Sequence, residues 1–115
     1  VLTYNWAYGP KGGVLAGKEW VCAISTGGPA DSYQAGGYNG FSMSEFLKPL
    51  QQTAHLLKTR FLPAYVFHGA VSASDDDVRR SADAMLAHIS DPLLDPARRL
   101  AALQADMEKR GIVLE

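Results

Sequence analysis

The residues best suited to chemistry follow the first apolar run of the chain, in the stretch Ser25-Thr26-Gly27-Gly28. Two successive glycines carry no Cβ atoms that would hold a flat ligand away, so their N–H groups are available as donors, and Thr26 adds a hydroxyl. Tyr33 and Tyr38 follow and offer aromatic surface with polar ends. This combination predicts a loop that hydrogen-bonds the edge of a planar, electron-rich ring. Paired glycines also occur in ordinary turns, which is the alternative interpretation.

Other kinds of site are less well supported by residue spacing. Neither G-x-x-x-x-G-K-[ST] nor G-x-G-x-x-G follows an apolar run, so no phosphate-binding loop is expected. The histidines His55, His68 and His88 lack the spacing of metal ligands, and we predict no metal site. His68 closes an apolar run, where it could line a pocket, but a surface or capping histidine is favoured. Cys22 is interpreted as a small buried apolar residue.

Two short apolar runs are predicted to be strands. Residues 19–25 and 61–69 are rich in β-branched and aromatic side chains, and glycine closes each run. In both runs the odd and the even positions are apolar, as expected of strands covered on both faces in a parallel sheet. The stretches 5–18 and 26–41 contain too much glycine and proline for regular structure and are predicted to be loops. A connection as long as the second is more often a binding loop than a spacer.

Three segments have helical spacing of apolar residues. Residues 42–59 begin with a possible capping box, and Pro49 predicts a bend or a restart near Lys48. Residues 74–89 begin with Ser74 as N-cap, and the following run of three aspartates suits a helix start better than a cation site. A last helix is expected over 95–111, and its apolar stripe could cover the core or pack on a partner.

The order strand, helix, strand, helix, helix indicates an α/β fold with a parallel sheet and crossover helices. Two strands covered on both faces need further neighbours, and the chain begins with Val-Leu instead of Met. We therefore expect residues 1–115 to be the C-terminal part of a single domain, with 95–111 as an additional C-terminal helix.

Composition narrows the class of protein. The chain has 115 residues, of which 47% are hydrophobic, and a net charge of −1, so one globular domain is expected. A charge near zero gives no reason to expect nucleic acid as a partner. A single cysteine rules out a disulfide framework and suits a reducing compartment. No apolar stretch approaches the roughly 20 residues needed to span a bilayer, so a cytoplasmic location is predicted.

The stretch "NWAYGPKGGVLAGKEWVCAISTGG", continuing to "YVFHG", resembles the second half of flavodoxin-like NAD(P)H:quinone oxidoreductases. This family includes the ancillary proteins of glutathione-regulated potassium-efflux systems. The pattern is an aromatic-Ala-Tyr-Gly stretch, a Leu-x-Gly-Lys turn, a strand ending in Thr-Gly-Gly, a helix with Pro-Leu and Thr-Ala, and a strand ending near His. The resemblance covers about residues 1–90. It implies a flavodoxin-like three-layer sandwich, of which this chain carries the C-terminal strands and helices.

The resemblance also implies a flavin cofactor, FMN or FAD, with NAD(P)H as co-substrate. Tyr33 matches a tyrosine near the flavin O2 that helps to stabilise charge as hydride arrives, and is the predicted catalytic residue. The family's loop for the flavin phosphate belongs to its first half and has no counterpart in this chain. The residues that match the loop contacting the isoalloxazine ring are Ser25, Thr26, Gly27 and Gly28.

Two further positions are implied to line the substrate pocket. Tyr8 matches an aromatic residue that reaches the neighbouring subunit's quinone pocket in homodimeric relatives. Asn39 stands where some members have a catalytic histidine, so the acid–base half of that mechanism differs here. The implied partners are a quinone-like small molecule and a second copy of the chain.

Three functions remain open from the sequence. The first is a flavin-dependent NAD(P)H oxidoreductase that passes a hydride to a quinone-like acceptor. The second is a flavin-binding ancillary subunit of a potassium-efflux antiporter, which would place the protein peripherally at the inner face of the membrane. The third is a non-catalytic interaction module.

Overall fold

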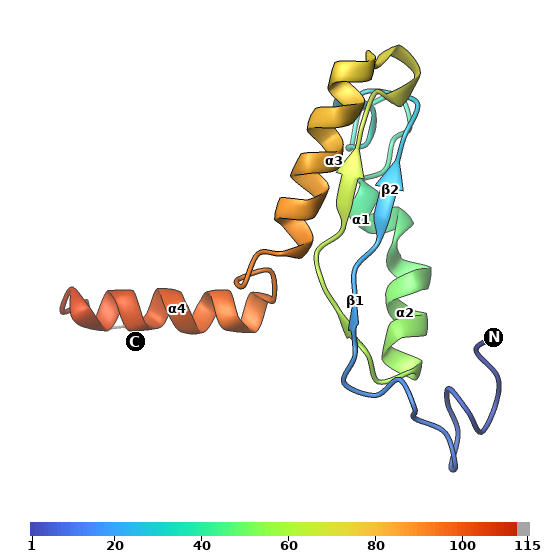
Figure 1. Cartoon of the computed structure of the whole chain (residues 1–115), viewed down its shortest axis with the longest axis vertical. Coiled ribbons are helices and arrows are strands. Elements are labelled where there is room, and N and C mark those ends of the chain that lie inside the picture. Colours follow the sequence, from blue (N-terminus) through green and yellow to red (C-terminus); the bar gives the residue numbers. More distant parts are fainter. Residues whose placement is uncertain (113–115) are drawn as a thin grey trace.

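The computed structural model describes residues 1–112 and contains two pairs of parallel strands flanked by helices (Figure 1). Strand β1 (Glu19–Trp20) pairs in parallel with β3 (Arg60–Phe61), and β2 (Ala23–Ser25) pairs in parallel with β4 (Tyr65–Phe67). The parallel arrangement predicted from the apolar runs is therefore confirmed. Because the strands are parallel, β2 and β4 end at the same edge.

Each predicted strand is interrupted once. Trp20 lies opposite Phe61, whereas Ala23 lies opposite Tyr65, so the second strand contains one more residue than the first between these two positions. This is the geometry of a β-bulge. Pro63 lies in the bulge, where its missing N–H is tolerated because it does not have to pair in the ladder. The expectation of two continuous strands was wrong for this reason.

The first predicted helix consists of two pieces, α1 (Met43–Phe46) and α2 (Lys48–Leu56), which confirms the restart near Lys48. Pro49 is at the second position of α2, where its missing N–H breaks no helical hydrogen bond. Ser42 and Glu45 form the predicted capping box at the start of α1, with N···O distances of 3.0 and 3.2 Å. The hydrogen bonds from the Ser42 backbone and hydroxyl lower the pKa of Glu45.

The two later helices also begin where they are predicted to begin. Helix α3 (Asp75–Ile89) starts with a capping box between Ser74 and Asp77, and α4 (Pro96–Lys109) is capped by Asp95. The Ser74 backbone N–H and hydroxyl, with the Arg80 guanidinium, lower the pKa of Asp77. The aspartate run is thus part of a helix start.

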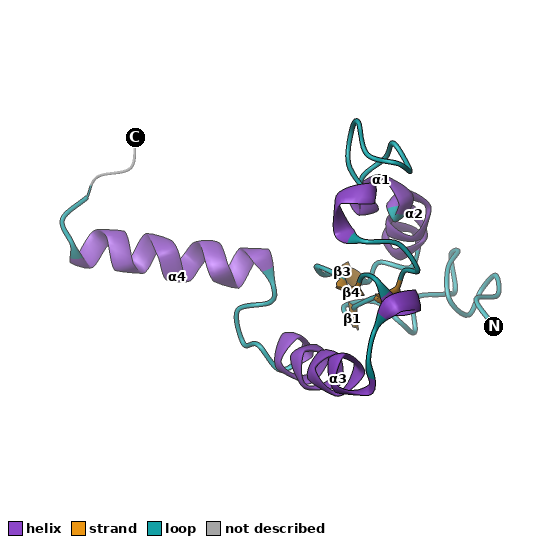
Figure 2. Cartoon of the chain, turned by 90° about the horizontal axis from the view of Figure 1, so that it is seen from above, coloured by secondary structure: helices purple, strands orange, loops and turns teal. Residues whose placement is uncertain are grey.

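The elements form three layers, with α1 and α2 on one side of the strands and α3 on the other (Figure 2). Ala54 and Leu57 of the α2 segment and Leu62 next to β3 belong to the buried apolar core. Helix α4 extends away from the rest of the molecule, and Leu100 and Leu103 are exposed on it. The radius of gyration, 17.9 Å, accordingly exceeds the about 13 Å of a compact chain of this length.

The strands are less covered than their composition predicts. Ala23 and Ser25 are exposed, and all residues of β4 are half-buried. Within residues 1–112 each strand pairs with one neighbour, and this leaves an open edge and part of one face uncovered. None of the helices in this part of the chain has the length and apolarity that a membrane crossing requires.

Candidate functional site

The Thr26–Gly28 turn lies at the carboxyl edge of β2 and is held there by the residues that leave β4. The Thr26 N–H donates to the Phe67 carbonyl at 2.9 Å, and the Ala70 N–H donates to the Thr26 carbonyl at 2.9 Å. The Gly69 N–H donates to the Gly28 carbonyl at 2.8 Å. Three backbone hydrogen bonds therefore fix the turn against the neighbouring strand end.

The two glycines of this turn offer unused donors. The N–H groups of Gly27 and Gly28 donate no hydrogen bond to any group within residues 1–112. Gly27 is exposed, and a Cβ atom on it would meet only the end of the Val71 side chain, at 3.0 Å. Val71 is itself 87% exposed. The backbone is thus open to a flat ligand that needs hydrogen-bond donors along one edge.

Three side chains gather beside this turn. The Thr26 hydroxyl donates to the Gly28 carbonyl at 2.9 Å and lies 3.0 Å from Nδ1 of His68. The Tyr33 ring packs on the His68 imidazole with 5.3 Å between ring centroids, and Phe46 of α1 meets Tyr33 edge-on at 6.1 Å. Thr26 is only 8% exposed. The cluster of Thr26, Tyr33 and His68 is built from neutral groups and one imidazole.

His68 is a residue that the sequence allows to line a pocket, although a surface or capping role is favoured there. It is half-buried within this cluster, so its interpretation as a surface or capping histidine was wrong. The strand register carries the signal: Ser25 lies opposite Phe67, and the next residues along both strands are Thr26 and His68. Two parallel strands ending side by side place these side chains together.

The structure brings together most, but not all, of the residues predicted to act. Ser25, the Thr26–Gly28 turn and Tyr33 lie at one edge, with Tyr33 at the end of the short 3-10 helix Ala30–Ser32 inside the long loop. Asn39 is in the same loop, and its backbone N–H donates to the Ser32 carbonyl at 3.0 Å. Tyr8 belongs to the segment that precedes β1, at the opposite end of the strands (Figure 1), where its ring meets that of Tyr4 at 5.6 Å.

The interpretation of Cys22 as a buried residue is wrong. Cys22 is half-exposed, not buried, and its sulfur accepts a hydrogen bond from the Trp20 indole N–H at 3.2 Å. Among the described residues no group of histidine, cysteine and acidic side chains is arranged to hold a metal ion.

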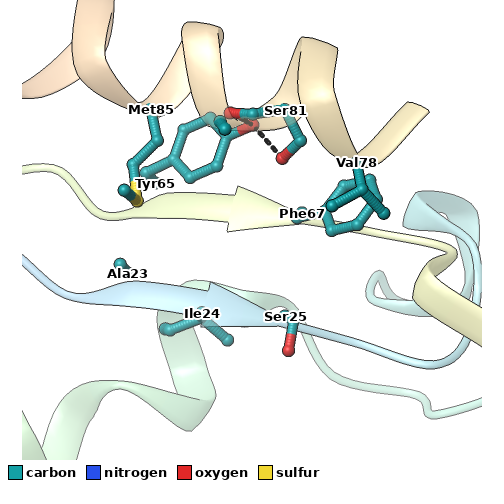
Figure 3. Close-up of a pocket in the computed structure, with 9 residues that line it drawn as sticks. Ala23, Ile24, Ser25, Tyr65, Phe67, Val78, Ser81 and Met85 are labelled. Carbon is teal, nitrogen blue, oxygen red and sulfur yellow. Dashed lines mark hydrogen bonds between the residues drawn. The ribbon is translucent and has the colours of Figure 1, made fainter. Parts of the chain in front are cut away.

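A separate hollow of about 290 Å³ lies between α3 and the strands β2 and β4 (Figure 3). Its walls are mainly apolar. The Tyr65 hydroxyl in this hollow is already bonded to Ser81 of α3, at 3.0 Å from the carbonyl and 2.7 Å from Oγ. The Gly27 and Gly28 donors are not among its lining residues, so the chemically equipped site is the turn and not this hollow.

Comparison with known proteins agrees with the parallel α/β fold. A family described as having a flavodoxin-like fold matches residues 1–89. Among curated relatives, an uncharacterized NAD(P)H oxidoreductase, YdeQ of Bacillus subtilis (strain 168), is 45% identical over 94% of this chain and 55% of its own length. KefG of Cronobacter sakazakii, an ancillary protein of a glutathione-regulated potassium-efflux system, is 31% identical over 81% of this chain and 50% of its own length.

Solved structures show the same likeness. The general stress protein 14 of Treponema denticola, solved in complex with FMN, has a TM-score of 0.65 and 38% identity, over 74% of this chain and 49% of that one. An NADPH-quinone reductase from P. pentosaceus has a TM-score of 0.69 and 28% identity, over 78% of this chain and 53% of that one. The chain thus spans about half the length of the relatives it matches. These matches confirm the resemblance drawn from the sequence, and the chain belongs to the family of proteins with a flavodoxin-like fold.

Proposed function

We propose that this chain supplies the ring-contacting part of a flavin-dependent NAD(P)H oxidoreductase. The observation that carries the proposal is the pair of unused N–H donors on Gly27 and Gly28, which lie beside Tyr33 at the carboxyl edge of parallel strands. Ligands of open α/β sheets bind at this edge. The relatives named as NAD(P)H oxidoreductase and NADPH-quinone reductase support the same reaction class.

Gly27, Gly28 and Tyr33 fit a flavin because they offer neutral hydrogen-bond donors to the edge of a flat ring. A bound flavin supplies the redox chemistry, taking a hydride from NAD(P)H and passing it to an acceptor. The Gly27 and Gly28 N–H groups and the Tyr33 hydroxyl would stabilise the negative charge that develops at the polar edge of the ring. Gly27 lacks the side chain that would separate the ring from the backbone. The complex of the Treponema denticola protein favours FMN over FAD.

The acceptor and the assembly are further parts of the proposal. The NADPH-quinone reductase among the similar structures supports a quinone-like acceptor. In one copy of the chain the segment before β1, to which Tyr8 belongs, lies at the end of the strands opposite to the turn, so Tyr8 would line a substrate pocket only in a second copy. We therefore propose a homodimer in which Tyr8 and Asn39 border the acceptor. We also propose that the contacts to the flavin phosphate come from the rest of the flavodoxin-like fold, since none of the described residues is assigned to them.

A second candidate function is that of a flavin-binding ancillary subunit of a potassium-efflux antiporter. The similarity to KefG over 81% of this chain favours it. This role is compatible with oxidoreductase activity. Co-purification of the full-length protein with an antiporter of this class would support it, and failure to co-purify under conditions where FMN is retained would count against it.

Titration of the full-length protein with FMN, followed by flavin fluorescence, tests the main proposal. Gly27→Ile places a large side chain against the proposed ring face and is expected to weaken FMN binding at least about tenfold. Ala16→Ile adds the same side chain at an exposed position in the loop before β1 and is the matched control. Uptake of neither FMN nor FAD by the wild-type protein, or equal affinity in both variants, would contradict the proposal.

Turnover tests the role of Tyr33. With FMN bound, NADPH-dependent quinone reduction is expected, and Tyr33→Phe keeps the ring packed on His68 while removing the hydroxyl. We expect kcat to fall about tenfold to a hundredfold, because one donor to the developing charge is lost. An unchanged kcat would remove Tyr33 from the catalytic residues.

A further inference from the structure

The geometry points to His68 as the positioning residue of this site: it holds the Thr26–Gly28 turn through a hydrogen bond and the Tyr33 ring through packing. The inference rests on the proposed function, because the turn and the ring are the parts that would meet the flavin. His68 is at the end of β4, so this support comes from a different strand than the donors themselves.

The hydrogen bonds of Thr26 show how His68 supports the Thr26–Gly28 turn. A threonine hydroxyl has a single hydrogen, and here it is donated to the Gly28 carbonyl at 2.9 Å. The oxygen can then only accept from Nδ1 of His68, at 3.0 Å, which requires the hydrogen to be on Nδ1. His68 therefore orients the Thr26 hydroxyl toward Gly28, and this chain of two hydrogen bonds holds the Gly28 peptide together with the backbone hydrogen bond from Gly69.

The contact between the two rings shows how His68 supports Tyr33. Tyr33 lies between the His68 imidazole, with centroids 5.3 Å apart, and the edge of Phe46, at 6.1 Å. Within residues 1–112 the Tyr33 backbone N–H makes one hydrogen bond, to the Ala30 carbonyl at 3.1 Å, at the end of a three-residue 3-10 helix. A short helix of this kind constrains its end weakly, so the two aromatic contacts determine where the phenol lies.

No other residue near the site combines a ring and a donor in this way. Asn39, at the position where some relatives carry a histidine, is exposed and gives its backbone N–H to Ser32. Asp77 and Arg80 of α3 line a neighbouring cavity together with His68 and pair with each other. His68 is therefore the one side chain of the described cluster that touches both Thr26 and Tyr33.

Two substitutions separate the two contacts. His68→Asn retains a donor close to the position of Nδ1 but removes the ring, whereas His68→Phe retains the ring but removes the donor. Each is expected to weaken FMN binding about threefold to tenfold, because a net hydrogen bond and an aromatic pair have similar magnitudes. His55→Phe makes the same change on the exposed face of α2 and is expected to leave binding unchanged.

A double-mutant cycle tests whether His68 acts through Thr26. Thr26→Val removes the hydroxyl, and its effect on FMN affinity is expected to be smaller in the His68→Phe background, because the bond between Thr26 and His68 is already lost there. A readout that needs no flavin is the NMR amide signal of Gly27 and Gly28, which is expected to shift in His68→Phe and to be retained in His68→Asn and in His55→Phe. Rescue by Asn distinguishes hydrogen-bonded positioning from general loss of packing.

The outcomes separate this inference from the proposed function. If the wild-type protein binds no flavin, the proposed function fails, and this inference fails with it. If the wild-type protein binds FMN but the His68 variants bind it equally well, or if the glycine amide signals of His68→Phe do not move, only the positioning role of His68 is overturned. Additive effects of Thr26→Val and His68→Phe would overturn it as well.

Discussion

Replacing Tyr65 by Phe removes one hydroxyl from the contact between β4 and α3 and leaves the ring in place (Figure 3). That hydroxyl lies 3.0 Å from the carbonyl of Ser81 and 2.7 Å from its Oγ. Both residues are half-buried, so water only partly replaces the lost partners. The substitution therefore isolates the hydrogen bonds that tie α3 to the strand carrying His68.

The magnitude follows from these contacts. A net hydrogen bond contributes about 0.5–1.5 kcal/mol, and the Tyr65 hydroxyl makes two of them. The Ser81 carbonyl also belongs to the helical hydrogen-bond pattern of α3, so it keeps a partner when the phenol is removed. We expect Tyr65→Phe to lower the free energy of unfolding by about 1–2 kcal/mol. Ser81→Ala removes only the Oγ contact and is expected to cost about 1 kcal/mol.

Urea unfolding followed by tryptophan fluorescence measures this loss as a lower midpoint with an unchanged slope. Tyr38→Phe is the matched control because Tyr38 is 95% exposed. In the Tyr65→Phe background, Ser81→Ala is expected to have little further effect, since the two side chains share one bond. The reasoning is refuted if Tyr65→Phe is as stable as Tyr38→Phe, or if the two changes in β4 and α3 are additive.

Three further substitutions test local features. Gly37→Ala would push a Cβ atom into the carbonyl of Asp31, so the long loop between β2 and α1 must shift; a loss of about 1–3 kcal/mol in unfolding free energy is expected from urea midpoints. Asp95→Ala removes the buried cap of α4 and also the ion-pair partner of Arg60, and is expected to cost at least about 1–2 kcal/mol, whereas Asp95→Asn retains the capping acceptor and should cost less, as thermal unfolding would show. The pKa of Asp77 is lowered in the folded protein, so its capping box stabilises above the ordinary aspartate pKa of about 4, and this contribution is lost as pH falls through the lower folded value. Asp77→Asn is expected to remove that part of the acid dependence, and a wild-type slope of midpoint against pH would contradict it.

The helix starts could be predicted from the sequence because each depends on a few adjacent residues. Ser42 with Glu45, Ser74 with Asp77, and Asp95 before Pro96 are short-range patterns whose partners lie within one turn. The glycine turn could be predicted for the same reason, since the ends of an apolar run and paired glycines are visible in the chain order. The restart at Lys48 follows from a single proline.

The β-bulge and the site role of His68 could not be predicted, because both depend on pairing between strands that are about 40 residues apart. The buried position predicted for Cys22 follows from its residue type alone, whereas in the structure it is half-exposed beside the bulge. Coverage of a strand depends on which neighbours and helices lie against it, and the residues of the strand do not encode this by themselves.

The bulge at Pro63 also explains how one short strand serves both helical layers. With regular alternation Phe61 and Tyr65 would share a face, because they are four residues apart. Instead, Phe61 lines a hollow with residues of α1 and α2, whereas Tyr65 bonds to Ser81 of α3. The one extra residue in the bulge places Phe61 and Tyr65 on opposite faces of the strand.

His68 is three residues beyond Tyr65 and therefore points to the side of α1, where Phe46 completes the packing around Tyr33. The arrangement of the candidate site thus depends on a backbone irregularity several residues away from it. The Thr26–Gly28 turn is held by residues at the end of β4, so its support is set by the register of β4 and not by the composition of the loop. A loop of such small and polar residues has little packing of its own, so its position depends on the position of the strand end to which it is hydrogen-bonded.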